Sequence, residues 1–386
     1  MGSTDSASGV ERSVGLAAGC LLGCAVDAPR SGGRVHRNGR GVSAARSNSV
    51  VKWIVAESVV QSQGGAVKSF DELSPRGQRE RMRRFGRRAL VPFGIDADVD
   101  LRFVAASFNT IFRVHQNPRS AALRIGPRER IHAERTEFVE AAWIRALRAD
   151  KVAEPPDVIE TRDGSPVSSC SMPGVPTARS CMLFEWVPGV TLSKRITGER
   201  LRGMGQLSAR LHQHGAGMSP SVQRSVPVAD RVLYWGVENR LHELGPAILE
   251  AFDRATASIE ELWAAPPSPP QLLHGDLTPH NVMVDGDRLI PIDFQDAVWG
   301  LDVQDLALSL LSLEQVDSSD DLRVTFRLGY ESVRPWPDLS PELLATLCAA
   351  RRLHQLNLSL TLRKPGLDVF VARMQGLIER WLRTPA

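Results

Sequence analysis

The stretch from Leu272 to Phe294 concentrates side chains that could do chemistry. Asp276, Asn281 and Asp293 stand there among short apolar runs, where acidic and amide groups are costly to bury. Two carboxylates and one amide oxygen that converge form a set of hard oxygen ligands, which suits Mg²⁺ better than the softer transition metals. Because protein-bound Mg²⁺ of this kind usually accompanies a polyphosphate, the residue types point to phosphoryl chemistry.

A strand, a loop and a hairpin are expected to position these residues. Residues 271–273 predict a strand that runs into the polar loop 274–281, after which the strand resumes. Asp285-Gly286-Asp287 predicts a turn because glycine tolerates positive φ, and residues 288–292 return as the partner strand. That return places Asp293 beside the polar loop.

Each of these residues has a simpler explanation when it is taken alone. An Asp in a tight loop often caps backbone amides, and Asn281, which follows Pro279-His280, could be a turn residue. Capping gives no reason for His-Gly-Asp, Asn and Ile-Asp-Phe to occur in this order across one strand–loop–hairpin unit. The joint pattern therefore favours the chemical interpretation.

The order of Asp276, Asn281 and Asp293 matches the template of phosphoryl-transfer enzymes, in which the first Asp accepts the proton of the substrate hydroxyl. Protein kinases carry His-Arg-Asp at this point, whereas this chain has His274-Gly275-Asp276 and later Asp293-Phe294-Gln295-Asp296. This variant resembles the aminoglycoside phosphotransferase family of kinase-like enzymes. The resemblance implies a catalytic role for Asp276, Mg²⁺ ligation by Asn281 and Asp293, and ATP as the phosphoryl donor.

The resemblance covers roughly residues 70–386 and implies that nucleotide phosphates are held near residues 106–110. Ser107 and Asn109 stand there in place of a Gly-rich loop, although the region contains no glycine. The Ala-Leu-Arg strand and the hinge sequence that follows are most similar to the branch with homoserine-kinase-like and stress-response kinases.

Arg124 is expected where the strand lysine of kinases reaches the nucleotide phosphates, because a long cation can neutralise phosphate charge. The alternative is a surface arginine on an edge strand. A helix at residues 134–148 supplies an ion-pair partner, for which Glu140 is the first choice and Glu137, one turn earlier, the alternative.

Residues 181–187 predict a buried strand that ends at the turn Pro188-Gly189. In the resembled fold this strand and turn form the hinge, which implies that backbone groups from Glu185 to Val187 meet the adenine. A core strand without any ligand is the alternative.

Composition excludes several classes of protein. The 386-residue chain has 47 basic and 44 acidic residues, so its formal charge of +3 gives no overall reason to expect nucleic acid or a membrane surface as a partner. No apolar run approaches the ~20 residues of a membrane span. Five cysteines without a Cys-x-x-Cys pair favour neither zinc nor a disulfide framework, so a cytoplasmic location is expected.

Three parts of the chain are expected. Residues 1–66 are rich in Gly, Ser, Ala and Arg and predict a mostly disordered leader, apart from a strand-like run at residues 50–60. Residues 67–187 predict a strand-rich N-lobe for the nucleotide, whose first element is an arginine-rich helix that starts at Ser74-Pro75. Residues 188–386 predict a helical C-lobe with the catalytic loop, the metal site and the substrate helices. The expected fold class is α+β, with a bilobal protein-kinase-like fold.

Several residues of the second half are expected to be structural. Leu201, Met204, Leu207 and Leu211 have helical spacing, and His212 and His214 at the end of that helix lack the partners of a zinc site. Asp305 resembles the residue with which the family holds its catalytic loop. Residues 341–382 predict helices that cover the acceptor. Asp302, Glu314 and Asp317 could attract an amine on the acceptor or be ordinary surface charge.

These features together favour an ATP-dependent phosphotransferase that acts on a hydroxyl of a small molecule, such as an amino alcohol, a sugar or an aminoglycoside. A Ser/Thr protein kinase of the stress-response type is an alternative, although only a few residues separate Asp293 from the helix near Asp302, which leaves little room for an activation loop. A second alternative is a kinase-like module that binds a nucleotide or a partner without transfer, as the missing glycines and the arginine at position 124 would allow.

Overall fold

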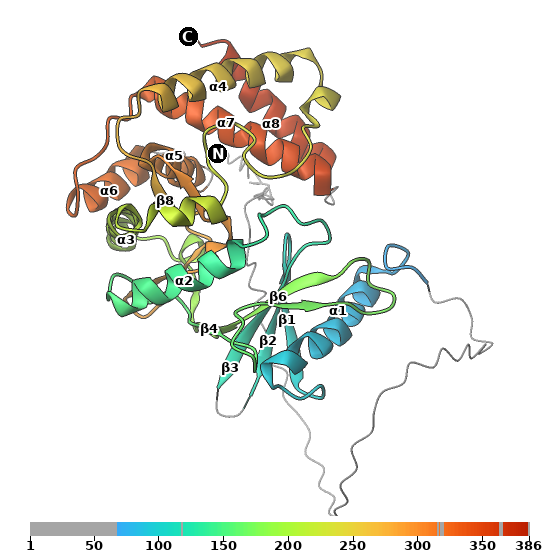
Figure 1. Cartoon of the computed structure of the whole chain (residues 1–386). Helices are drawn as coiled ribbons and strands as arrows, with labels where there is room; N and C mark the ends of the chain where they lie inside the picture. Colours follow the sequence, from blue (N-terminus) through green and yellow to red (C-terminus); the bar gives the residue numbers. More distant parts are fainter. Residues whose placement is uncertain (1–67, 117–118, 315, 317–319, 363–365, 385–386) are drawn as a thin grey trace, which may run out of the picture.

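The computed structural model describes residues 68–116, 119–314, 316, 320–362 and 366–384. The expected leader at residues 1–66, its strand-like run and the turn at Asn117-Pro118 lie outside the described residues. Figure 1 shows a twisted sheet with its flanking helices in one part of the molecule and a group of helices in the other. The expected α+β, bilobal kinase-like fold is confirmed.

The first lobe is built on an antiparallel six-stranded sheet of order β1-β2-β3-β6-β4, with β5 paired to β6. Its side-chain alternation puts Leu123 and Ile125 on one face and Ala122 and Arg124 on the other, as expected for Arg124. The strands are β1 (Asp100–Ala106), β2 (Thr110–His115), β3 (Ser120–Ile125), β4 (Val158–Ile159), β5 (Ser168–Cys170) and β6 (Arg179–Glu185).

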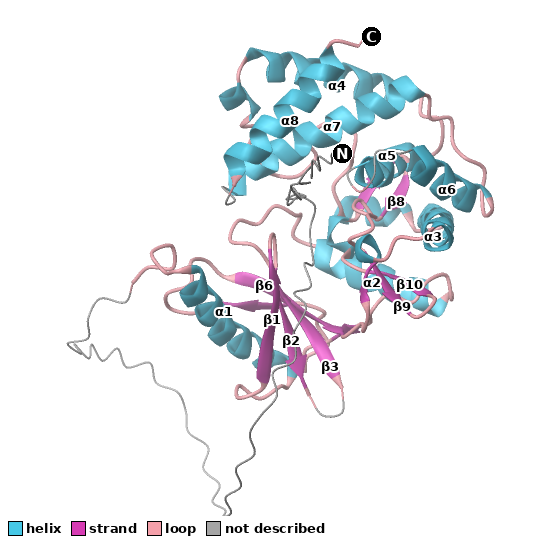
Figure 2. Ribbon diagram, turned by 180° about the vertical axis from the view of Figure 1, so that it is seen from behind, coloured by secondary structure: helices cyan, strands magenta, loops and turns pink. Residues whose placement is uncertain are grey.

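Helices cover the two faces of this sheet. The helix α1 (Pro75–Leu90) starts at Ser74, whose side chain accepts a hydrogen bond from the amide of Gly77, and a short 3₁₀ turn, Val91–Phe93, follows it. Its apolar side, with Phe85 and Leu90, packs on the face that carries Leu123 (Figure 2). The helix α2 (Thr136–Ala149) packs Trp143 and Leu147 against the opposite face.

Two strands differ from expectation. The hinge strand β6 runs from Arg179 to Glu185 rather than over residues 181–187, because the chain leaves the ladder before Pro188. The strand β5 was not expected from the sequence, and it pairs Ser168 with Cys181 of β6.

The strand–loop–hairpin unit forms as expected, but across two small sheets. The strand β8 (Gln271–Leu273) pairs with β11 (Val298–Gly300), whereas β9 (Val282–Asp285) pairs with β10 (Arg288–Pro291) and β7 (Val190–Thr191). The loop between β8 and β9 therefore crosses from one sheet to the other, and both of its ends are fixed by strand pairing.

Helices form most of the second lobe. The helices α3 and α6 approach so closely that a Cβ on Gly205 would lie 2.0 Å from the backbone oxygen of Phe326. The stripe Leu201, Met204, Leu207 and Leu211 is buried on α3, as predicted. The longer helices are α3 (Gly198–Ala216), α4 (Pro246–Ala264), α5 (Asp302–Glu314), α6 (Asp320–Glu331), α7 (Pro341–Leu362) and α8 (Leu367–Leu382), and the 3₁₀ turns are Leu192–Lys194, Pro220–Ser225, Leu241–Leu244 and Phe294–Asp296 (η5).

A second apolar core joins α4 to α7 and α8, the two helices that span the predicted helical residues 341–382, and it contains Met374 and Trp381. Among the described residues, no helix has the length and apolar character that crossing a bilayer requires.

Candidate active site

The catalytic loop buries Asp276 at the turn between the two small sheets. The side-chain amide of Asn281 donates to Oδ2 of Asp276 at 2.7 Å and to its backbone oxygen at 2.8 Å, so the two predicted residues are in direct contact. Gly275 has φ of +77°, and a Cβ there would lie 2.1 Å from the backbone oxygen of Asp296. Glycine is therefore required for the loop to pass so close to η5.

Asp305, on α5, holds this loop by a hydrogen bond to its backbone. Its Oδ1 accepts a hydrogen bond from the amide of Gly275 at 2.9 Å, and its Oδ2 lies 3.1 Å from Nε2 of His212. Burial acts to raise the pKa of Asp305, but the hydrogen bond and charge of His212 outweigh it and lower that pKa. The structural role predicted for Asp305 is confirmed. His212, whose Nδ1 lies 2.9 Å from the hydroxyl of Tyr330, belongs to the same network rather than to a zinc site.

His274 ties the loop to the strand that carries Asp293. Its Nδ1 accepts from the amide of Asp276 at 3.3 Å, so Nε2 is the protonated nitrogen and donates to the backbone oxygen of Ile292 at 3.2 Å. Burial lowers the pKa of His274, which agrees with this neutral tautomer.

Asp293 lies at the end of this hairpin with a left-handed backbone, at φ of +65°. Its Oδ1 forms an ion pair with Nη1 of Arg124 at 3.1 Å. Burial raises the pKa of Asp293 to about 7, although the charge of Arg124 acts to lower it. The Asp293 carboxylate is thus held next to the Arg124 guanidinium of the sheet.

The structure decides between the two candidate partners of Arg124. Both carboxylate oxygens of Glu140 contact the guanidinium, and the Nη1–Oε1 distance is 2.8 Å. Glu137 instead pairs with Arg130 at 3.0 Å. Burial alone would lower the pKa of Arg124, but the charges of Glu140 and Asp293 raise it, so the guanidinium stays protonated. Arg124 is a buried residue and not the surface arginine of the alternative interpretation.

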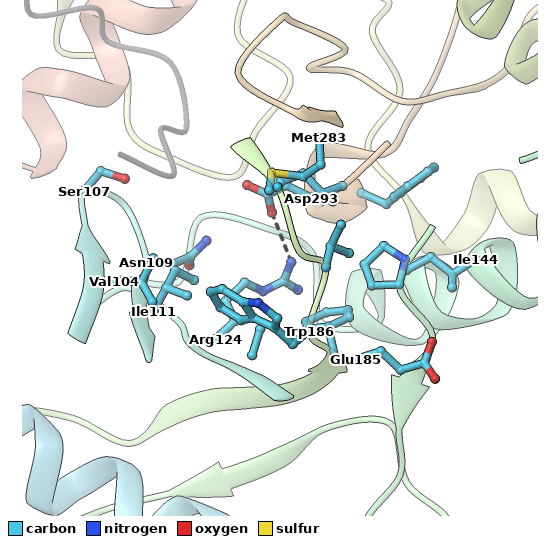
Figure 3. Close-up of a pocket in the computed structure, with 17 residues that line it drawn as sticks. Val104, Ser107, Asn109, Ile111, Arg124, Ile144, Glu185, Trp186, Met283 and Asp293 are labelled. Carbon is cyan, nitrogen blue, oxygen red and sulfur yellow. Dashed lines mark hydrogen bonds and ion pairs between the residues drawn. The ribbon is translucent and has the colours of Figure 1, made fainter. Parts of the chain in front are cut away.

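A pocket between the sheet and the hairpin brings most of the predicted nucleotide residues together (Figure 3). Ser107, Asn109, Arg124, Glu185, Val187 and Asp293 all line it, whereas Glu140 lies behind Arg124. The rest of the wall is largely apolar and comes from both lobes, with Val104, Ile111, Ala122, Ile144, Phe184, Met283, Ile292 and Phe294. A slot with one charged end and apolar walls suits a nucleotide base with its phosphates.

At the hinge, the backbone amides of Glu185 and Trp186 already donate to other residues of the chain. The amide of Glu185 donates to the oxygen of Asp157 at 2.9 Å, and that of Trp186 donates to Ser120 at 3.2 Å. The carboxylate of Glu185 points away from the pocket in Figure 3 and is exposed. Val187 is therefore the hinge residue best placed to offer its amide to a ligand.

The loop without glycine is held by a contact with the other lobe. Nδ2 of Asn109 donates to Oε1 of Gln295 at 2.8 Å, and the amide of Ser107 donates to the backbone oxygen of Asn109 at 3.1 Å. Oδ1 of Asn109 is buried and has no hydrogen-bond partner among the residues that the structure describes. The side chain of Asn109 thus links this loop to η5.

The proposed ligands fit a divalent cation. Oδ1 of Asn281 is buried and has no partner within the described part of the chain, while Nδ2 of the same side chain is fixed by Asp276. The described residues contain no group of three or more His, Cys, Asp or Glu side chains with metal-binding geometry. One amide oxygen and one carboxylate suit Mg²⁺, which commonly completes its shell with phosphate oxygens and water.

Four further residues, which were not among the predicted site residues, lie next to the site. Nε2 of His132 lies 2.8 Å from Oδ1 of Asp296, and Arg351 forms an ion pair with Asp276 at 3.3 Å while it donates to the hydroxyl of Tyr234 at 2.8 Å. Burial and the charge of Asp296 hold the pKa of Asp276 well above its usual range, and the charge of Arg351 opposes them. Asp296 belongs to the Asp-Phe-Gln-Asp motif, whereas no sequence pattern marked His132, Tyr234 or Arg351.

Comparison with known proteins agrees with this geometry. The model of a phosphotransferase enzyme family matches residues 100–341. A homoserine kinase from Gluconobacter oxydans is 27% identical over 184 residues, which are 46% of this chain and 58% of that protein. A homoserine kinase from Rhizobium johnstonii is 30% identical over 231 residues, 58% of this chain and 63% of that protein. The chain thus spans 58% to 63% of the length of the curated relatives it matches.

Two solved structures have a similar fold. A microcompartment-associated aminopropanol kinase is 21% identical with a TM-score of 0.58, over 77% of this chain and 96% of that one. An amicoumacin kinase in complex with AMP-PNP and Ca²⁺ is 18% identical with a TM-score of 0.59, over 72% of this chain and 88% of that one.

Proposed function

Because the chain belongs to the phosphotransferase enzyme family, we propose that it transfers the γ-phosphoryl group of ATP to a hydroxyl of a small molecule. One observation carries the proposal: the backbone amide of Ile292 donates to the backbone oxygen of Asn281 at 2.9 Å, so Asp293, which lines the pocket, follows directly on a residue bonded to the Asp276–Asn281 pair. The neighbours named as aminopropanol kinase and amicoumacin kinase, the second with AMP-PNP and Ca²⁺, support a nucleotide and a divalent cation as cofactors.

Asp276 orients the acceptor hydroxyl and takes its proton. The hydroxyl oxygen forms a bond to the γ-phosphorus as the bond between that phosphorus and ADP breaks, so the products are the phosphorylated acceptor and ADP. Asn281 fixes the Asp276 carboxylate through Oδ2, which keeps the proton acceptor in one orientation. General base action of this kind typically contributes 10²–10⁴-fold to a rate.

Asn281 and Asp293 would hold the divalent cation, which we propose is Mg²⁺ and which, when bound, neutralises phosphate charge. Arg124 counters the charge of the phosphates from the sheet, and Glu140 fixes its guanidinium. Val187, together with Glu185 at the hinge, borders the adenine, and Ser107 and Asn109 border the phosphates. In these terms residues 67–187 bind the nucleotide and residues 188–386 supply catalysis and acceptor binding.

A small acceptor fits better than a protein. Only η5 and β11 lie between Asp293 and the start of α5 at Asp302, so this stretch has no extended segment on which a peptide substrate could lie. The buried free thiols of Cys170, Cys181 and Cys348 and the use of ATP suit a cytoplasmic enzyme.

The decisive experiment incubates purified protein with labelled ATP and Mg²⁺ against amino alcohols, sugars, hydroxy acids, aminoglycosides and unfolded proteins. We expect a small acceptor to be labelled, and Asp276→Asn to reduce turnover at least about a hundredfold. Labelling of proteins alone would overturn the small-molecule acceptor. Unchanged turnover in Asp276→Asn would overturn the catalytic assignment. If the chain only binds its nucleotide or a partner, the wild type will not turn over ATP above the level of the Asp293→Ala variant.

A further inference from the structure

Arg351 reaches the catalytic carboxylate from the helix α7. Its Nη2 lies 3.3 Å from Oδ1 of Asp276, the oxygen that Asn281 does not use. Its Nη1 donates to the hydroxyl of Tyr234 at 2.8 Å, and its side chain is 11% exposed. A guanidinium thus stands at the oxygen that an incoming hydroxyl must reach.

Aromatic rings hold this arginine in place. Tyr234 stacks on His354 with 4.3 Å between the ring centroids, and Trp235 meets the same histidine edge-on at 4.6 Å. Nδ1 of His354 in turn lies 3.0 Å from the backbone oxygen of Val232. The guanidinium carbon of Arg351 lies 5.9 Å from the centre of the Trp235 ring. Arg351 is therefore a supported cation and not a mobile surface side chain.

Of the three acidic residues considered for attracting an amine, the two that the structure describes are paired with arginines. Asp302 is buried and bound to Arg334 at 3.0 Å and to Ser268 at 2.8 Å. Glu314 pairs with Arg323 at 3.1 Å, and Asp317 lies outside the described residues. An acceptor with several ammonium groups would have to bring positive charge beside a buried guanidinium, which Coulomb repulsion disfavours.

We propose that Arg351 binds a carboxylate of the acceptor, so that the substrate is a small hydroxy acid. The inference rests on the proposed phosphotransferase function and names its substrate class. A guanidinium offers a planar pair of donors that matches a carboxylate. Since the guanidinium contacts Asp276 directly, the hydroxyl and the carboxylate of the acceptor lie about 3–6 Å apart, as across two or three carbons.

Acceptor binding then also prepares the base. The acceptor carboxylate takes over the guanidinium of Arg351, which releases Oδ1 of Asp276 for the hydroxyl. An alcohol without the carboxylate leaves Arg351 on Asp276 and reacts poorly. Arg351 is thus a specificity residue whose effect depends on the charge of the acceptor.

Three related alcohols separate these effects: L-homoserine, 4-hydroxybutyrate, which lacks the amine, and 3-aminopropan-1-ol, which lacks the carboxylate and its carbon. Transfer from ATP to each probe is measured for the full-length wild type and for Arg351→Gln. The matched control is Arg352→Gln, since Arg352 lies next to it on α7 and faces Glu314 at 3.6 Å.

The wild type is expected to favour the two carboxylates over 3-aminopropan-1-ol by at least about tenfold in kcat/KM. Arg351→Gln lowers kcat/KM for the carboxylates by about 10- to 100-fold, the range of a hydrogen bond to a charged group, and so removes most of the preference. Arg351→Lys keeps the positive charge but lacks the paired donors of a guanidinium, so it retains part of the preference for the carboxylates. Arg352→Gln keeps the wild-type ratio.

Two results would overturn the inference. One is that the wild type phosphorylates 3-aminopropan-1-ol with the same kcat/KM as the two carboxylates. The other is an equal loss for all three probes in Arg351→Gln, which would mean that Arg351 only positions Asp276. Calorimetric binding of 4-hydroxybutyrate separates this inference from the proposed function: binding that depends on Arg351, without transfer to any acceptor, refutes the function alone. If the protein shows no binding of 4-hydroxybutyrate and no transfer to any acceptor, both the inference and the proposed function are refuted.

Discussion

Replacement of Glu140 by Gln tests whether the buried ion pair of the first lobe serves the nucleotide. The Glu140 side chain is 1% exposed, and both of its oxygens contact Arg124. Gln keeps the shape but removes the charge, so among the described residues Arg124 retains Asp293, at 3.1 Å, as its one ion-pair partner. The Arg124 guanidinium then turns toward Asp293, and we expect this to withdraw both groups from the phosphates and the cation.

The expected loss of stability in Glu140→Gln follows from the burial of the ion pair. Loss of one partner of a buried ion pair typically costs about 3–5 kcal/mol, and the remaining contact with Asp293 places this case near the lower end, at about 3 kcal/mol. That loss lowers the melting temperature by roughly 5 °C in a protein of this size. A misplaced charge-assisted hydrogen bond to phosphate raises the KM for ATP by about tenfold or more.

Thermal unfolding and the KM for ATP measure the two effects separately. The control is Glu137→Gln on the same helix, because Glu137 pairs with Arg130, whose side chain is 51% exposed, and such a pair contributes about 1 kcal/mol or less. Equal losses in the two variants would refute the assignment of Glu140. A large stability loss in Glu140→Gln with an unchanged KM would mean that the pair only holds the fold.

Three further predictions concern the frame around the site. Gly275→Ala forces a Cβ to 2.1 Å from the backbone oxygen of Asp296 at φ of +77°, so we expect at least a tenfold loss of turnover in a steady-state assay; wild-type turnover would contradict the close approach. The pKa of Asp305 is lowered in the folded protein, so its stabilising effect is present above the unfolded pKa of about 3.9 and is lost as the pH falls through the lower folded value. Urea unfolding from pH 6 to pH 3 should therefore show a shallower acid loss in Asp305→Asn than in the wild type, and identical slopes would refute this. Gly205→Ala meets backbone at 2.0 Å and should lower the unfolding free energy by about 1–3 kcal/mol, whereas Gly198→Ala, with nothing within 4 Å, should not.

Local sequence patterns predicted much of the fold because they act over short separations. The turn Asp285-Gly286-Asp287 joins β9 to β10 as expected, since a glycine at φ of +61° suits a tight hairpin. The periodic apolar residues of α3, which are Leu201, Met204, Leu207 and Leu211, are buried as expected. The predicted site residues around the motif meet for the same reason, because a short hairpin returns Asp293 to the loop of Asp276.

Contacts between distant parts of the chain had no such signal. Arg351 meets Asp276 across 75 residues, and Asn109 meets Gln295 across 186, so no spacing rule connects them. The three-residue strand β8 could not reveal its partner, because Leu272 and Leu273 fit a buried strand in either small sheet. The division of β8 and β9 between two sheets is therefore set by tertiary packing rather than by local preference.

The short segment from Asp293 to Asp296 is tied to the first lobe three times: Arg124 holds Asp293, Asn109 holds Gln295, and His132 holds Asp296. The nucleotide pocket lies between the same two lobes. Parting the lobes breaks these contacts together, whereas the chemical step leaves them in place. Opening of the pocket between the lobes therefore requires all three contacts to break together, which couples the position of Asp293 to that of the first lobe.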